Sequence, residues 1–158
     1  MRALGVLAAA LLAAAPVRGQ RLAPRLETAS PATLLGLSPR LGIPLDSLVR
    51  RSRGTWIRDI QVGNGDTAAV GTTVRVHYVG QLADGSIFAA TRDKPFTAVL
   101  GAGVVIEGWE EGIPGMRVGG RRQLVVPPDL GYGEKGEGRV PPGAVLVFDV
   151  TLIAVEPN

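Results

Sequence analysis

The stretch AVLVFDVTLIAV, residues 144–155, is the longest strand-like segment of this sequence. Successive side chains of an extended strand point to opposite faces. One face would carry Leu146, Phe148, Val150 and Leu152, and the other Val145, Val147, Thr151 and Ile153. Because both faces are largely apolar, the stretch predicts a central strand of a sheet that is covered on both sides.

Four further strands and one helix are expected around this stretch. The strands are expected at residues 55–62, 73–79 and 121–126, and at residues 87–88 after a hairpin-type turn at residues 83–86. Only residues 105–111 are expected to form a helix, which Gly108 and Gly112 keep short. The predicted fold is an α+β domain of about five strands whose sheet wraps around one short α-helix.

Composition excludes several classes of functional site. The chain of 158 residues has no cysteine and a single histidine, which excludes disulfides, thiolate chemistry and a paired-histidine metal site. Its 22 glycines and 12 prolines favour a turn-rich, mostly β domain. We therefore expect neither a metal nor a cofactor.

The net charge of +3 is unevenly distributed along the chain. Residues 1–53 hold eight arginines and two carboxylates, a net of +6, whereas residues 54–158 hold nine basic and twelve acidic residues, a net of −3. No basic stripe interleaved with aromatic residues occurs in this slightly acidic part. A nucleic-acid partner is therefore not expected.

Residues 1–19 have the pattern of a secretory signal peptide. Arg2 precedes an apolar run at residues 3–15, and Val17 and Gly19 are small enough for cleavage after residue 19. The alternative is an uncleaved membrane anchor, although a run of about 13–15 residues is short for a bilayer span. The pattern predicts an exported protein, periplasmic or secreted, with no stable membrane insertion after cleavage.

Residues 20–53 are expected to be a leader or linker ahead of a domain at residues 54–158. Prolines at positions 24, 31, 39 and 44 interrupt any long helix. Residues 44–51 could form one or two helical turns. We interpret the segment as a tether, with partner binding or dimerisation as the alternative.

The polar residues show no familiar catalytic arrangement. His77 lies in the middle of a predicted strand, and a structural role is expected for it. Glu110 and Glu111 are adjacent, so on a helix their carboxylates point about 100° apart and cannot act as a pair. Any catalysis must therefore work without a nucleophile or a metal.

Seven aromatic residues lie in separate predicted elements, several of them beside turns. They are Trp56, Tyr78, Phe88, Phe96, Trp109, Tyr132 and Phe148. The abundant Val, Leu and Ile can fill a core without them, which favours an aromatic-lined pocket. Ordinary core packing is the alternative, and the spacing alone leaves both open.

A series of short motifs resembles the FKBP family of peptidyl-prolyl isomerases. The motifs are residues 76–80 (VHYVG), 84–88 (DGSIF), 92–96 (RDKPF), 105–112 (VIEGWEEG), 116–119 (MRVG), 132–133 (YG), 141–142 (PP) and 146–150 (LVFDV). They follow in the family's order over residues 54–156. The resemblance implies a twisted antiparallel sheet wrapped around a short helix, with a pocket between the two.

Together with the signal-like pattern at residues 1–19, the resemblance implies an exported bacterial prolyl isomerase that accelerates X–Pro isomerisation while exported proteins fold. The implied catalytic residues are Trp109 at the pocket floor, Phe148 in its wall, and Ile106 and Tyr132, whose N–H and hydroxyl would bind substrate carbonyls. The other implied substrate-binding residues are Tyr78, Phe88, Phe96, Val105 and, in an overhanging loop, Val140. The implied ligands are proline-containing polypeptides and macrolide inhibitors, and the expected state is a monomer.

Three positions depart from the family's pattern. Ala89 stands where an acidic residue usually follows the pocket phenylalanine, Ala98 where a bulky residue is frequent, and Leu130 where an aromatic one is frequent. Since a carboxylate at position 89 could serve both turnover and macrolide binding, its absence predicts a slower enzyme. The alternative class is a chaperone or adaptor that binds proline-containing segments with negligible turnover.

Overall fold

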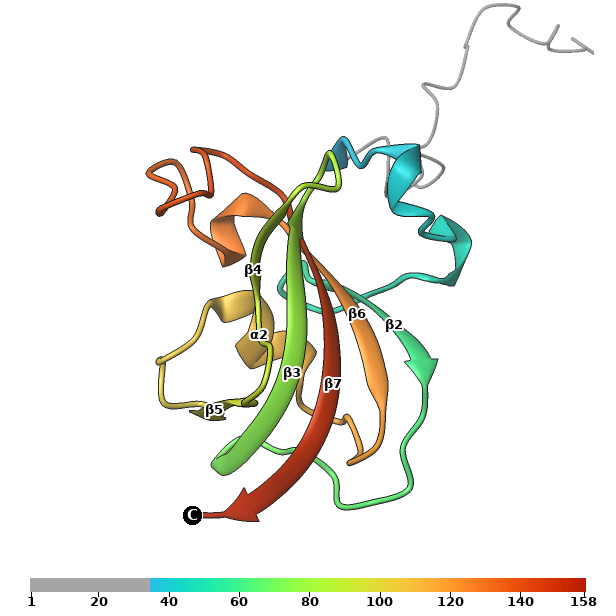
Figure 1. Cartoon of the computed structure of the whole chain (residues 1–158), viewed down its shortest axis with the longest axis vertical. Helices are drawn as coiled ribbons and strands as arrows, with labels where there is room; N and C mark the ends of the chain where they lie inside the picture. Colours follow the sequence, from blue (N-terminus) through green and yellow to red (C-terminus); the bar gives the residue numbers. More distant parts are fainter. Residues whose placement is uncertain (1–34) are drawn as a thin grey trace, which may run out of the picture.

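The computed structural model describes residues 35–158, which form one sheet with one short α-helix (Figure 1). The strands are β1 (Val49–Arg50), β2 (Trp56–Gln61), β3 (Thr72–Leu82), β4 (Ile87–Ala90), β5 (Phe96–Val99), β6 (Arg121–Val126) and β7 (Leu146–Pro157). The helix is α2 (Glu107–Gly112), and the 3-10 turns are η2 (Pro39–Leu41), η3 (Leu45–Ser47) and η4 (Pro128–Leu130). No helix within residues 35–158 has the length and apolarity needed to cross a bilayer. The predicted signal peptide lies outside the described residues.

β7 is a central strand, as its two apolar faces predict. The strands follow the order β1-β2-β6-β7-β3-β4, with β5 paired to β3 off this path, and all their pairings are antiparallel. β7 pairs with β3 on one side and with β6 on the other. The sheet is twisted and curves around α2 (Figure 1). The predicted α+β architecture is confirmed.

The described part of the chain contributes seven strands to the sheet, whereas the sequence predicts about five. β1 has two residues, too few to show an alternating pattern. β5 has four residues, starts directly after Pro95 and pairs only with β3. Both segments become strands because they pair with a neighbouring strand, and a local sequence pattern does not show such pairing.

The inner face of the sheet packs against α2. The four residues of β7 on this face are at most 3% exposed and belong to the same core cluster as Trp109 of the helix. They are Leu146, Phe148, Val150 and Leu152. A Cβ atom on Gly112 would lie 2.8 Å from Leu124 Cδ2, and one on Gly108 would overlap the side chain of Val126. The two helix glycines therefore allow α2 to approach β6 closely, which is what brings Trp109 against the sheet.

Residues 35–48 lie at one end of the sheet (Figure 1) and pack against its outer face there. Leu37 and Leu48 are each 8% exposed and belong to one cluster with the fully buried Val125 and Val147. A segment that precedes the predicted domain thus covers Val145 and Val147, whereas Ile153 farther along the same face is 42% exposed. The predicted cover on both faces therefore holds only for the first part of this stretch.

The folded unit consequently starts before residue 54, where the sequence analysis placed its boundary. β1 pairs with β2, and the Ser38 N–H donates to the Ala83 carbonyl at 2.8 Å. Pro39 begins the 3-10 turn η2 and Pro44 directly precedes η3, so residues 44–51 contain one short 3-10 turn. Residues 35–53 are therefore part of the domain rather than a free tether, and residues 20–34 lie outside the described part of the chain.

Candidate active site

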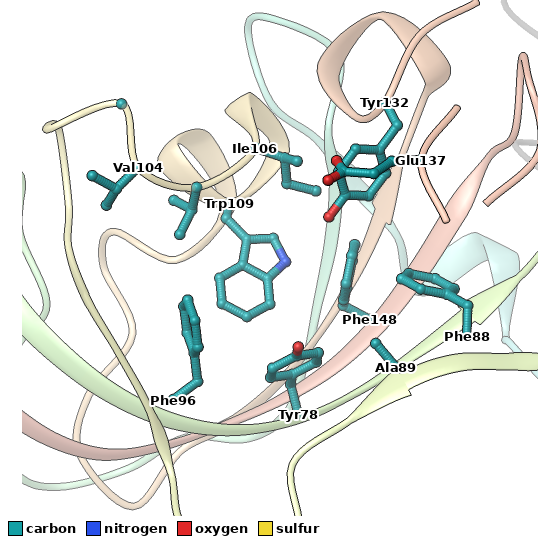
Figure 2. Close-up of a pocket in the computed structure, with 12 residues that line it drawn as sticks. Tyr78, Phe88, Ala89, Phe96, Val104, Ile106, Trp109, Tyr132, Glu137 and Phe148 are labelled. Carbon is teal, nitrogen blue, oxygen red and sulfur yellow. The ribbon is translucent and has the colours of Figure 1, made fainter. Parts of the chain in front are cut away.

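A cavity of about 430 Å³ opens between α2 and the inner face of the sheet (Figure 2). Its lining comprises six aromatic residues, five small or aliphatic residues and one charged residue. They are Tyr78, Phe88, Ala89, Phe96, Gly103, Val104, Val105, Ile106, Trp109, Tyr132, Glu137 and Phe148. Eight of the nine substrate-binding residues expected from the resemblance therefore meet at one cavity, among them the four expected catalytic ones.

Trp109 forms the floor of this cavity (Figure 2). Its ring forms T-shaped contacts with the rings of Tyr78, Phe148 and Phe96, with centroid distances of 5.0, 5.3 and 5.8 Å. Edge-to-face contacts of this kind are favourable because they place the positive edge of one ring on the negative face of another. Trp109 and Phe148 are 4% and 3% exposed and also belong to the core cluster. The aromatic set thus serves both the pocket and the core, the two alternatives that the spacing left open.

Gly80 of β3 makes room for the aromatic wall. A Cβ atom at Gly80 would lie 2.7 Å from Phe88 Cζ and 3.1 Å from Phe148 Cε1. Ala89 pairs with Gly80 across the strands and lies beside Tyr78 in the cavity (Figure 2). In the part of the chain that the structure describes, the Tyr78 hydroxyl forms no hydrogen bond. The Tyr78 hydroxyl is therefore an unpaired donor in the cavity.

Ile106 supplies a free backbone donor at the start of α2. Its carbonyl accepts the N–H groups of Trp109 at 2.9 Å and of Glu110 at 3.2 Å, which starts the helix. Its own N–H donates no hydrogen bond within residues 35–158. The first N–H groups of a helix have no intrahelical acceptor. A carbonyl bound in the cavity would satisfy this donor.

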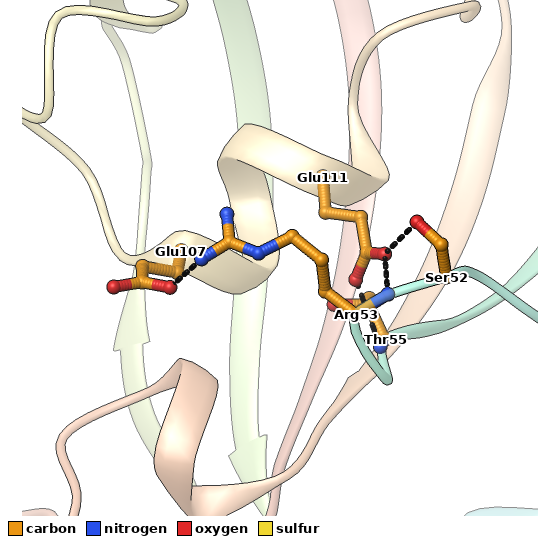
Figure 3. Close-up of polar contacts among 5 residues, drawn as sticks. All are labelled: Ser52, Arg53, Thr55, Glu107 and Glu111. Atoms are coloured by element: carbon orange, nitrogen blue, oxygen red, sulfur yellow. Dashed lines mark hydrogen bonds and ion pairs between the residues drawn. The ribbon is translucent and has the colours of Figure 1, made fainter.

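Glu111 fixes α2 to the segment before β2 (Figure 3). Its carboxylate accepts the N–H groups of Arg53 at 2.5 Å and Thr55 at 3.0 Å and the hydroxyl of Ser52 at 3.4 Å. The Arg53 guanidinium forms an ion pair with Glu107 one turn earlier. Partial burial raises the pKa of Glu111, but the hydrogen bonds from Arg53, Thr55 and Ser52 outweigh it and hold the pKa below its usual range.

Glu110 fixes α2 to the loop on its other side. Its carboxylate accepts the N–H groups of Gly101 and Gly103, the latter at 3.1 Å, and Gly103 lines the cavity. Glu110 and Glu111 thus bind different segments, as their adjacent positions on a helix predict. Both act as acceptors that position the helix and its neighbouring loops.

Tyr132 brings a hydroxyl into the cavity from the loop after η4 (Figure 2). Burial raises the pKa of this hydroxyl above its ordinary value of 10.0, and the negative charge of Glu137 and the nearby Tyr78 raise it further. The group is therefore protonated at neutral pH and can donate a hydrogen bond to a bound carbonyl.

Val140 does not reach the cavity, contrary to the expectation from the resemblance. Its side chain is 5% exposed and packs in the core cluster. Two backbone hydrogen bonds join it to Glu137, whose N–H donates to the Val140 carbonyl at 2.9 Å and whose carbonyl accepts the Val140 N–H at 2.8 Å. Glu137, rather than Val140, is the residue of this loop that lines the cavity.

The sequence analysis missed three lining residues, Gly103, Val104 and Glu137. Val104 is 65% exposed and precedes the predicted helix, so no burial pattern identifies it. Glu137 lies in a glycine-rich loop that contains other charged residues, and this composition is typical of a solvent-exposed turn. Only the backbone bridge to Val140, formed on folding, places Glu137 at the cavity.

Other residues singled out in the sequence lie away from the cavity. His77 Nδ1 lies 3.0 Å from Thr91 Oγ1, in agreement with a structural role. Ala98 and Leu130 are each 6% exposed, so of the three departures only Ala89 lines the cavity. Residues 35–158 contain no cluster of three or more His, Asp and Glu side chains that could hold a metal ion.

Comparison with known proteins relates the chain to one family. The family described as FKBP-type peptidyl-prolyl cis-trans isomerase matches residues 65–153. An FK506-binding protein of Neisseria meningitidis serogroup B is 46% identical over 105 residues, which cover 65% of this chain and 96% of that protein. FK506-binding protein 4 of Aspergillus fumigatus is 44% identical over 109 residues, which cover 68% of this chain and 22% of that protein.

The fold is also similar to a solved structure. The crystal structure of FkpA from Escherichia coli superposes with a TM-score of 0.67 and 36% sequence identity, covering 75% of this chain and 55% of that chain. The chain thus spans 22% of the Aspergillus protein and 55% of the FkpA chain, so the similarity concerns only part of each.

Proposed function

We propose that this chain, which belongs to the FKBP-type peptidyl-prolyl cis-trans isomerase family, catalyses rotation about X–Pro bonds in polypeptides. The observation that carries the proposal is the aromatic cavity over Trp109, whose lining holds donors without a partner in the described residues. Two of these donors, the Ile106 N–H and the Tyr132 hydroxyl, are the ones expected to bind substrate carbonyls. The cavity has the apolar floor that a proline ring needs and the donors that peptide carbonyls need.

The mechanism follows from the loss of amide resonance during rotation. The barrier is about 18–20 kcal/mol in water, because the C–N bond must lose its double-bond character. The twisted amide has less charge separation than the planar one, so transfer from water into an apolar cavity stabilises the transition state relative to the ground state. The two donors would hold the flanking carbonyls, and each would contribute about 0.5–1.5 kcal/mol. No nucleophile or proton transfer is required.

Exchange NMR on a short Leu-Pro peptide tests the proposal directly, since it measures cis-trans exchange without a coupled protease. The folded chain should raise the exchange rate in proportion to its concentration. Trp109→Leu should reduce this effect more than tenfold. Trp56→Leu is the matched control, because Trp56 packs in the outer cluster, and it should retain the effect. A folded wild-type chain that leaves the exchange rate unchanged would refute the proposal.

A second candidate function is proline-segment binding with negligible turnover. It is favoured by Ala89, which lines the cavity where the family usually carries a carboxylate. Titration of the same peptide separates the two functions. Saturable shifts of cavity resonances without faster exchange would establish a binding module, and a macrolide would then compete for the same cavity.

We further propose an exported bacterial protein that acts, as a monomer, on proline-containing exported polypeptides. The support is the signal-like pattern at residues 1–19, where a positive residue precedes a short apolar run. Mass spectrometry of the chain recovered from a periplasmic fraction should show an N-terminus at residue 20. Recovery of the intact chain in the membrane fraction would instead establish an uncleaved anchor.

A further inference from the structure

Glu137 is the one residue with a formal charge in the lining of the cavity. It lies on the wall that also presents Tyr132, opposite Tyr78 and Phe96 (Figure 2). All other lining residues are aromatic, aliphatic or glycine. A peptide bound over Trp109 therefore meets a single negative charge.

Backbone hydrogen bonds hold Glu137 in this place. Its two bonds with Val140 are 2.9 and 2.8 Å long, and the Val140 side chain is buried in the core. On the other side, the Gly136 N–H donates to the Tyr132 carbonyl at 3.1 Å. The loop therefore fixes Glu137 relative to Tyr132, although the Glu137 side chain itself is exposed.

The carboxylate of Glu137 has no counter-charge. Within residues 35–158 its side chain forms no ion pair and no hydrogen bond, and the ion pairs there join other residues. Lys135 and Arg139 lie two residues away on either side, are exposed and do not line the cavity. The negative charge of Glu137 also contributes to the raised pKa of the Tyr132 hydroxyl, so its field reaches the cavity wall.

We propose that Glu137 sets the substrate preference of the cavity, favouring polypeptides with Lys or Arg beside the proline and disfavouring those with Asp or Glu. This inference rests on the proposed function, because it concerns the substrate of the same cavity. An exposed pair of opposite charges contributes modestly. We expect a preference of about 2–5-fold in kcat/KM for Lys over Leu, a similar penalty for Glu, and a weaker effect at high salt.

Two sets of model peptides test the inference by exchange NMR. One set carries Lys, Leu or Glu immediately before the proline, and the other carries them immediately after it. Each set is measured with wild type, Glu137→Gln and Glu137→Lys. Glu134→Gln is the matched control, since Glu134 is an exposed carboxylate of the same loop that does not line the cavity.

In at least one of the two sets, we expect the wild type to turn over the Lys peptide faster than the Glu peptide. This preference should disappear in Glu137→Gln, reverse in Glu137→Lys and remain in Glu134→Gln. Equal Lys-to-Glu ratios for wild type and Glu137→Gln in both sets would overturn the inference, while turnover of the Leu peptide would still support the proposed function. If no peptide were turned over, the proposed function would fail. Peptide affinities from chemical-shift titration would then decide the charge preference by the same ratios.

Discussion

The carboxylate of Glu111 accepts the backbone N–H of Thr55 at 3.0 Å, which fixes α2 to the start of β2 (Figure 3). Arg53 strengthens this connection, because its N–H binds Glu111 and its guanidinium binds Glu107. The helix that carries Trp109 is therefore held by the segment before β2 as well as by the core. These contacts lie outside the cavity and act on it only through the position of the helix.

We expect Glu111→Gln to lower the free energy of unfolding by about 1–2 kcal/mol at neutral pH, because a charged acceptor of three hydrogen bonds is replaced by a neutral amide. The folded state holds the pKa of Glu111 below its ordinary value of 4.5. Its stabilising effect is therefore present above that value and lost as the pH falls through the folded pKa. Urea unfolding at neutral pH and near pH 3 measures this change.

The difference between wild type and Glu111→Gln should shrink on acidification. Glu107→Gln is the control. Both side chains of its ion pair with Arg53 are exposed, so the pair contributes less than about 1 kcal/mol to the free energy of unfolding. A constant difference at both pH values would show that Glu111 does not bind its donors as a carboxylate.

The second prediction concerns the segment that covers the outer face of the sheet. Leu48→Ala should lower the free energy of unfolding by about 2–3 kcal/mol, because Leu48 is 8% exposed and packs in a cluster with Val147. The adjacent Val49 is 62% exposed, so Val49→Ala should change stability by less than about 0.5 kcal/mol. Equal effects in chemical denaturation would mean that the segment does not pack on the sheet in solution.

The sequence predicts that β7 is covered on both faces, but it does not identify the cover. The alternation of residues 144–155 requires apolar partners for Val145 and Val147, and this part of the prediction is confirmed. Leu37 and Leu48 belong to a proline-interrupted segment in which one or two helical turns at most are expected. Their burial is decided by the outer face they meet, so residues 35–53 resemble a linker when the sequence is considered alone.

For the cavity too, sequence motifs predict the residues in or beside regular elements, but not those placed by tertiary contacts. Trp109, Ile106 and Tyr132, which the motifs single out, line one cavity, and each lies in or beside a regular element. The motifs fail at the loop of residues 134–143, where Val140 turns into the core and Glu137 lines the cavity. The direction of these side chains depends on two backbone hydrogen bonds that no residue pattern encodes.

The third prediction compares the hydroxyl of Tyr132 with the floor of the cavity. Tyr132→Phe should lower kcat/KM on a Leu-Pro peptide by about 2–12-fold, the equivalent of one net hydrogen bond of 0.5–1.5 kcal/mol. Trp109→Ala should also destabilise the domain by about 3–5 kcal/mol, because Trp109 is 4% exposed and belongs to the core. Exchange NMR and urea unfolding of both variants check this. Negligible effects from both would mean that the reaction takes place elsewhere.

The last prediction concerns Ala89, which lines the cavity beside the unpaired hydroxyl of Tyr78 (Figure 2). A carboxylate at this position can accept a hydrogen bond from Tyr78 and orient polar groups near the bound amide. We expect Ala89→Asp to raise kcat/KM by about 5–30-fold, corresponding to about 1–2 kcal/mol of transition-state stabilisation, and to strengthen macrolide binding.

Two controls separate this effect from a change in folding. Ala89→Asn offers Tyr78 an acceptor of similar size without a charge, so a gain limited to the Asp variant assigns the effect to the carboxylate. Urea unfolding of both variants checks stability, because a carboxylate that fails to bind Tyr78 would be partly buried without a partner and its pKa would rise. If Ala89→Asp folds normally and leaves both turnover and macrolide affinity unchanged, position 89 does not limit the proposed activity. The free Tyr78 hydroxyl would then remain available to a substrate carbonyl.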